Sequence, residues 1–475
     1  MKKIIILLLL IPKILLSQEL IGTIDINLKD IKNYCQFEDQ SNDATVFLIE
    51  TKDGLNALKT NNKFEVTNKF ILKKEDELSD YFGFSTDNSE QYYTYWKKNN
   101  KIIEIQTIDF TNKSIQKSEI ENPIENNERM INAFSHNNLL HIITATKNSG
   151  LLNIYIFNKN SVNKKVVDCS SIVFLDNNNL KIGLWKFITN QNLSIYDYNF
   201  QRVYTNQMNL NVVNATNKRK IYVGQNKIIL SSDINNNFSQ FLTINLTDFV
   251  PTSQIISKQD ENEKNGFIST QTNSFVINDV IFIAKFGEEQ LSILIKNFDN
   301  QNIKTFSFGL NEGDAYINSE LFEESGSFKH REVLKNKNKF FKHSFSKNPS
   351  ISGNYIDGKY YLTIAGVSYP RPQSSQVLGV FGFLGGAASA IINDRSGTSI
   401  SLYSDKNIVY FNSVINNKTF DTDPLKVGNS KLDNARYYLE SNTSKQEHIH
   451  LFEKNNHYYL ISKNEKKDQL LIYRF

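Results

Sequence analysis

Pairs of short runs, rich in apolar and β-branched residues, recur along most of the sequence. Such runs, bounded by turn residues, are typical of β-strands, and two in close succession are typical of a hairpin. The second members recur at intervals of about 40 to 50 residues, with no helical pattern between them. The runs are KIIEIQTIDF (101–110), LLHIITAT with LLNIYIFN (139–158), LKIGLWKFI with LSIYDYNF (180–200), KIILSS with FLTINLTDF (227–249), VIFIAKF with LSILIKNF (280–298) and YYLISK with LLIYRF (458–475).

Several runs are apolar on successive residues, as in FVINDVIFIAKF at 275–286. A sheet with one wet face shows stricter alternation, so we expect both faces to be buried. Stacking small sheets around an axis buries both faces, and a repeat of about four short strands is typical of a β-propeller blade. We therefore predict an all-β propeller of seven or eight blades. The chain resembles propellers as an architecture, because a Gly-His with Trp-Asp signature is missing and 85–89 lacks the glycine of an aspartate box.

We predict a single domain at 18–475, with insertions at about 310–350 and 370–395. The alternative is an outer-membrane β-barrel, because Leu471, Tyr473 and Phe475 alternate at the C-terminus as they do in exported barrels. A closing propeller blade would leave the same terminus. Barrel strands need about 9 to 11 residues of alternating character, and IIEIQTIDF and KIILSSD do not keep that register, which favours the propeller.

Asparagine pairs stand just before several of the apolar runs. They occur at 99–100, 137–138, 178–179 and 455–456. Asn tolerates positive φ and is common in two-residue hairpin loops. The pairs therefore predict tight turns between neighbouring strands.

The N-terminus has the pattern of a secretory signal peptide. Lys2 and Lys3 precede an apolar segment that ends at Ser17-Gln18, and cleavage after Ser17 fits the preference for a small residue there. A buried N-terminal strand is the alternative, and the apolar run is too short for a transmembrane anchor. We predict export, with the mature chain periplasmic, outer-membrane-associated or extracellular.

Export makes the two cysteines of the sequence a candidate disulfide. Cys35 and Cys169 both lie in the mature chain, and an oxidising compartment would let them pair. Two buried thiols are the alternative.

Catalytic motifs are missing from the sequence. No Gly-x-Ser-x-Gly elbow, P-loop, His-Glu-x-x-His or Cys-x-x-Cys occurs, and Ser344 with Lys347 matches only a fragment of a serine-lysine motif by chance. The pattern indicates no cofactor. A net charge of +4 from 54 Lys+Arg and 50 Asp+Glu excludes a strongly basic nucleic-acid binder.

Metal ligands are also not indicated. His448 and His450 would share one face of a strand, but the sequence fixes no carboxylate near them. A turn at 455–456 would pair His457 with Lys454. The motif at 233–237 begins like a calcium loop, but Phe238 stands where the loop needs glycine.

The segment 373–393 carries no charge and is rich in glycine and alanine. Four glycines disfavour a solvent-exposed helix, so something must cover it. It either packs on the propeller or, through 377–392, contacts a membrane surface or a partner protein. The candidate contact residues are Phe381, Phe383 and Leu384.

Two further segments are candidates for binding. Tyr369 and Arg371 lie in a stiff, proline-containing loop and are candidate ligand contacts. The most basic stretch, 329–347, is either a solvated loop or short helix, or a surface for anionic glycans or lipid headgroups.

Two functions remain in view. The first is a non-enzymatic binding or assembly module at the cell envelope, whose partner is a protein or a glycan. The second is a propeller enzyme acting on a polysaccharide or another envelope polymer, which would need two carboxylates about 5 to 9.5 Å apart. Because the sequence singles out no such pair, the binding module is the leading hypothesis.

Overall fold

The computed structural model describes sixteen segments of the chain, and every structural statement below concerns them. They are residues 18–26, 33–39, 41–72, 80–87, 90–189, 200–204, 212–259, 271–310, 316–325, 331–368, 407–424, 434–435, 438, 447–454, 457–464 and 467–475. The predicted signal peptide at 1–17 lies outside these segments.

Four of the sheets contain four antiparallel strands in chain order. The first has β2 (Asn33–Asp39), β3 (Ala44–Thr51), β4 (Gly54–Thr60) and β5 (Val66–Leu72). The second has β6 (Asp80–Thr86), β7 (Gln91–Lys97), β8 (Ile102–Asp109) and β9 (Ser114–Glu121). The third has β10 (Glu128–His136), β11 (Leu139–Thr146), β12 (Leu151–Asn158) and β13 (Ser161–Asp168). The fourth has β21 (Gln271–Ile277), β22 (Val280–Phe286), β23 (Gln290–Lys296) and β24 (Asn302–Gly309).

Two sheets have five strands. One contains β16 (Gln201–Tyr204), β17 (Arg219–Val223), β18 (Lys227–Ser232), β19 (Phe238–Asn245) and β20 (Pro251–Ser257), with β16 parallel to β17. The other runs in the order β26 (Arg331–Val333), β25 (Phe322–Ser325), β29 (Asn407–Asn416), β28 (Lys359–Ser368) and β27 (Asn348–Ile356). A small hairpin of β14 (Phe174–Leu175) and β15 (Lys181–Ile182) and three helices, α2 (Leu184–Thr189), α3 (Val212–Ala215) and α4 (Lys337–Phe345), complete these elements.

The remaining four-stranded sheet joins the two ends of the chain. Strand β1 (Glu19–Asp25) pairs with β32 (Gln469–Arg474), which continues through β31 (His457–Asn464) to β30 (Glu447–Lys454). The side chains of Glu19 and Arg474 form an ion pair, and the Gln469 amide donates to Asp25 at 2.7 Å. An N-terminal strand therefore closes the sheet built by the C-terminal strands.

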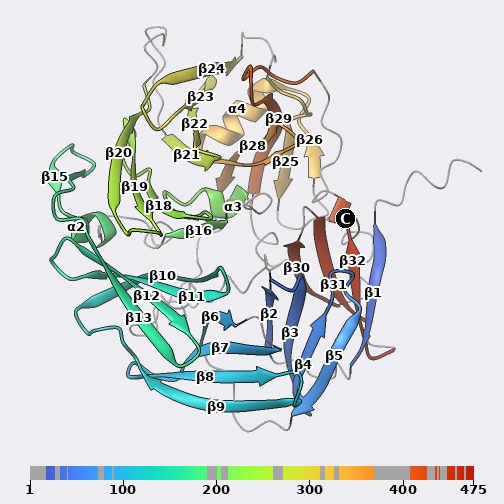
Figure 1. The fold of residues 1–475 in the computed structure, drawn as a ribbon. Coiled ribbons are helices and arrows are strands. Elements are labelled where there is room, and N and C mark those ends of the chain that lie inside the picture. The colour runs from blue at the N-terminus through green and yellow to red at the C-terminus, as the bar shows by residue number, and fades with distance from the viewer. Residues whose placement is uncertain are drawn as a thin grey trace, which may run out of the picture.

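The seven sheets of four or five strands in the described segments stand side by side around a common centre (Figure 1). In most of these sheets the first strand in the sequence lies nearest the centre, and the following strands lie progressively further out (Figure 1). This arrangement is a β-propeller, and it confirms the predicted all-β propeller fold.

Both faces of the sheets are buried, as the apolar runs predict. On β3, Val46 packs against Tyr92 of the following sheet, whereas the next residue, Phe47, packs with Ile472 of the closing sheet. Neighbouring residues of a strand point to opposite faces, so each strand contributes to two cores. Fully burying side chains of this size stabilises the fold by about 1.5 to 3 kcal/mol each.

The asparagine pair at 137–138 forms the expected turn. Asn137 and Asn138 have φ values of 48° and 60°, and His136 pairs directly with Leu139 across the loop. Positive φ at both central residues gives the twist that suits a two-residue hairpin. Residues 278–279 repeat this geometry between β21 and β22.

One sequence prediction needs correction. The run 180–188, predicted as a strand, is strand only at Lys181–Ile182 and continues as α2. Leu184, Phe187 and Ile188 are buried together because they follow helical spacing. The segment predicted as an insertion at about 310–350 includes β25, which pairs with β29. Within the described segments, no helix has the length and apolar character needed to cross a membrane.

Candidate functional site: a buried lysine and aspartate network

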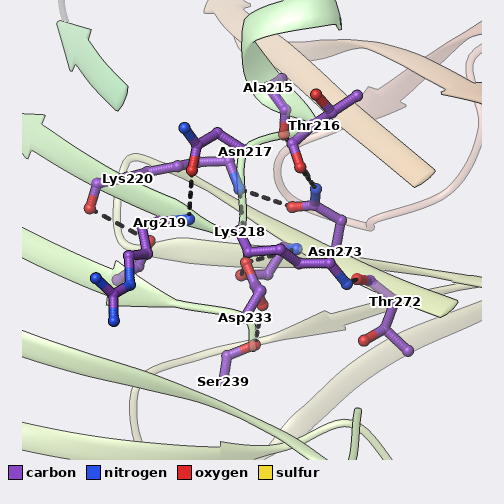
Figure 2. A network of polar contacts seen from close by, with 12 residues as sticks. Ala215, Thr216, Asn217, Lys218, Arg219, Lys220, Asp233, Ser239, Thr272 and Asn273 are labelled. Carbon is purple, nitrogen blue, oxygen red and sulfur yellow. Dashed lines mark hydrogen bonds and ion pairs between the residues drawn. The ribbon is translucent and has the colours of Figure 1, made fainter. Parts of the chain in front are cut away.

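Asp233 is the centre of a network of buried charges. It follows β18, and its carboxylate is fully buried. Ser239 donates its hydroxyl to Oδ1 at 2.6 Å, and Ser274 donates both its backbone N–H and its hydroxyl to Oδ2, at 3.0 and 2.8 Å. Because Ser274 lies on β21, this carboxylate joins two neighbouring sheets. Figure 2 shows Asp233 with Ser239.

Two buried lysines balance the charge of Asp233. The ammonium nitrogen of Lys258 lies 3.1 Å from Oδ1, and that of Lys220 lies 3.5 Å from Oδ2. Burial alone would raise the pKa of Asp233, but Lys258 and Lys220 hold it well below its usual range. The lowered pKa favours the ionised aspartate at neutral pH.

Lys258 reaches further groups of both sheets. Its ammonium donates to the carbonyl of Asn235 at 2.8 Å and to the hydroxyl of Thr272 at 3.0 Å. Burial lowers its pKa to about 8, against the opposing attraction of Asp233 and with a further lowering by Lys218 and Lys220. The buried ammonium thus costs free energy that its hydrogen bonds only partly offset.

Asn273 extends the network to a third sheet. Its side-chain oxygen accepts from Lys220 at 2.6 Å, and its amide nitrogen lies 2.9 Å from the carbonyl oxygens of both Thr216 and Pro349. Thr216 follows α3 and lies beside Asn273 in Figure 2, and Pro349 belongs to β27. One side chain therefore fixes the relative positions of three segments that lie far apart in the sequence.

Arg219 acts beside this network in the same way. Its fully buried guanidinium donates to the last carbonyl groups of α2, those of Phe187 at 2.6 Å and Ile188 at 2.7 Å. It also lies over the ring of Phe200, 5.3 Å from the centroid. Cations stabilise the C-terminal end of a helix, so Arg219 holds α2 against this sheet.

A second buried carboxylate ties together the four strands of one sheet. Glu128 of β10 accepts from Thr144 at 2.6 Å, from Asn153 at 2.9 Å and from the hydroxyl of Tyr155 at 2.9 Å. Lys164 of β13 completes the set at 3.0 Å. The carboxylates of Asp233 and Glu128 both accept hydrogen bonds from several groups of the protein. This arrangement indicates that they hold strands together and do not bind a substrate.

The structure places few of the sequence-predicted site residues. Tyr369, Arg371, Phe381, Phe383 and Leu384 lie outside the described segments.

The two cysteines are both described and buried. Cys35 belongs to the cluster between the sheets β2–β5 and β6–β9, and Cys169 to the cluster between β10–β13 and β16–β20. The structure does not bring them together. Burial, with Asp168 nearby, raises the pKa of the Cys169 thiol to about 12, which makes it a weak nucleophile.

The histidine strand differs from the expected regular strand. A register shift falls between His448 and His450 in β30, whereas His457 pairs with Lys454 as predicted. No cluster of three or more metal-ligating side chains occurs among the described residues.

The sequence pattern identified Asp233 only as the first residue of an unlikely calcium loop. Asn235 of the same motif instead caps the backbone N–H of Asn237 at 2.8 Å. The sequence does contain one sign of this network. Strand β17 begins with two cationic residues, Arg219 and Lys220, continues with apolar residues and is buried throughout.

Comparisons with known proteins identify no relative. No family model and no curated protein matches the chain. Among solved structures, the WD40 domain of SCAP from fission yeast has 9% identity and a TM-score of 0.32, with 96% of this chain and 87% of that chain covered. A prolyl endopeptidase has 8% identity and a TM-score of 0.33, covering 92% and 46%, and the Dos1 propeller has 10% and 0.24, covering 67% and 64%. Such low scores support no statement about activity, and the propeller fold rests on the strand pairing described above.

Replacing Asp233 with Asn should lower the free energy of unfolding by about 3 to 5 kcal/mol, because it leaves two buried ammonium groups without their counter-charge. Urea unfolding followed by circular dichroism measures the change. Asp421→Asn is the matched control, because water screens its exposed pair with Lys304 at 2.9 Å and the substitution should change stability little. Equal effects of the two substitutions would contradict the assigned role of Asp233.

The lowered pKa of Lys258 predicts a specific pH dependence. The folded protein loses this proton near pH 8 and the unfolded chain near its usual value of 10.5, so between these values the unfolded chain binds more protons. The free energy of unfolding should therefore rise by about 1.4 kcal/mol per pH unit from this group. Urea unfolding at several pH values should show this contribution in wild type and in the control Lys227→Met, whose ammonium is at the surface. It should vanish in Lys258→Met, and parallel profiles for wild type and Lys258→Met would contradict it.

Proposed function

We propose that the protein is an exported β-propeller that serves as a non-enzymatic binding or assembly module at the cell envelope, with a protein or a glycan as its partner. The observation that carries this proposal is that the buried charged side chains hold the fold together. Asp233, Lys220, Lys258 and Glu128 all bond to groups of the protein itself and join strands or whole sheets. The interior is thereby a rigid support, and rigid supports reduce the entropy lost when surface groups bind a partner.

The position of the first strand supports export. The predicted signal peptide ends at Ser17, and β1 begins at Glu19. Cleavage after Ser17 would leave the whole of β1 available to pair with β32. Removal of the leader is thus compatible with closure of the last sheet.

The predicted contact segments extend from one sheet end. Ser368, the last residue of β28, pairs with Asn407, the first residue of β29. Residues 369–406, with Tyr369, Arg371 and 377–392, join these two positions in the sequence and lie outside the described segments. Connections between elements of a rigid scaffold commonly carry binding residues, and contact of 377–392 with a membrane or a partner is part of the proposal.

The second candidate function, an enzyme acting on an envelope polysaccharide, has one observation in its favour. Burial raises the pKa of Glu38 to about 7, with Lys454 opposing this shift and Asp43 adding to it. The ammonium of Lys454 lies 3.2 Å from the Asp43 carboxylate. A carboxyl whose pKa is raised toward 7, near a second carboxyl, is the pattern of glycosidase acid and base pairs.

Co-sedimentation with isolated cell envelopes tests the two candidates together. The binding module predicts that the purified protein sediments with the envelopes and releases no reducing sugar from them. Glu38→Gln should then behave like wild type. Release of reducing ends by wild type that is lost in Glu38→Gln would favour the enzyme, and a failure to sediment would contradict the binding module.

A further inference from the structure

The positive charge of the chain is concentrated in one segment. Residues 331–347 contain six Lys and Arg side chains and one acidic side chain, Glu332, which gives five net positive charges with His neutral. The whole chain has a net charge of only +4. The rest of the protein is therefore close to neutral, and the net positive charge of the chain comes from this segment.

Helix α4 presents part of this charge to solvent. Its apolar side buries Phe340 and Phe341, and Asn336 caps its start by accepting from the backbone N–H of Asn338 at 2.7 Å. Lys339 and Lys342, three residues apart, and Lys335 just before the cap are exposed. We call Lys335, Lys339 and Lys342 the α4 lysine face.

Three lysines elsewhere on the surface have close acidic partners. Lys98 lies 2.5 Å from Glu119, Lys227 lies 2.6 Å from Asp279 and Lys304 lies 2.9 Å from Asp421.

The α4 lysine face differs from these pairs. Lys339 comes only within 3.8 Å of Glu323 and Glu332, and within the described part of the chain no ion pair involves Lys335 or Lys342. Like charges three or four residues apart on a helix destabilise it by a few tenths of a kcal/mol. The face therefore retains positive charge that the protein does not neutralise.

The nearest carboxylate is already used. Both oxygens of Glu323 lie within 2.9 Å of Nδ1 of His343, on the last turn of α4. Two other cations of the segment serve the helix itself: Lys347 donates to the carbonyl of His343 at 2.6 Å, and Lys337 lies over the ring of Phe308. These contacts fix α4 and leave its exposed lysines in a defined arrangement.

We propose that the α4 lysine face binds an acidic polysaccharide through the polymer's carboxylate or sulfate groups. The proposal rests on the proposed function and names the chemistry of its partner. A helix that binds a lipid surface inserts apolar side chains, and single-stranded nucleic acids stack on aromatic rings. Phe340 and Phe341 are buried, so neither ring is available for insertion into lipid or for base stacking. Helix α4 presents exposed ammonium groups, which suit a polyanion.

Isothermal titration with polygalacturonate at 50 mM salt tests the proposal. Wild type should bind it, and raising the salt to 300 mM should weaken binding at least tenfold because exposed charges are screened. Replacing Lys335, Lys339 and Lys342 together by Gln should weaken binding at least tenfold. The matched control replaces Lys98, Lys227 and Lys304 by Gln, which removes the same charge from paired lysines and should change the affinity less than twofold.

Neutral dextran, anionic phospholipid vesicles and single-stranded DNA complete the design. Binding of any of them as tightly as polygalacturonate, or equal losses in the two triple variants, would overturn the proposal. Envelope co-sedimentation, measured in parallel, separates it from the proposed function. If wild type sediments with envelopes but does not bind polygalacturonate, the polysaccharide proposal fails and the binding module stands.

Discussion

The fold depends on burying two apolar faces of every small sheet. Strand β3 shows the requirement at single-residue scale, since Val46 and Phe47 pack against sheets on opposite sides. An isolated sheet of this kind would leave both faces in water, and a row of sheets would leave two faces exposed at its ends. Arranging the sheets around a centre, with β1 completing the sheet of β30–β32, removes this problem.

Polar groups inside such a ring are constrained by the same packing. A buried charge is tolerated only when it is paired and hydrogen-bonded, and Asp233 meets this requirement with two lysines and two serines. Because these partners come from two sheets, the network fixes how the sheets sit against each other. Because protein donors surround the Asp233 carboxylate, neither of its oxygens is available to a substrate.

Much of the architecture could be predicted from the sequence because its signals are local. The hairpins β11–β12, β18–β19, β22–β23 and β31–β32 follow from apolar runs, and the turn at 137–138 follows from the tolerance of Asn for positive φ. Helix α2 was missed because six residues hold fewer than two turns of periodicity. The Asp233 network could not be predicted, since Lys220, Lys258 and Ser274 become its neighbours only when two sheets pack together.

Native-state hydrogen exchange tests most directly whether closure by β1 supports the whole ring. Ile24→Asp places a charge on the buried side of β1, where Ile24 is 2% exposed, and Leu20→Asp makes the same change where Leu20 is 51% exposed. The account predicts that Ile24→Asp lowers amide protection in β18 and β19, several sheets away, as well as in β31 and β32, and that Leu20→Asp leaves all four strands protected. Loss of protection confined to β1, β31 and β32 in Ile24→Asp would contradict it.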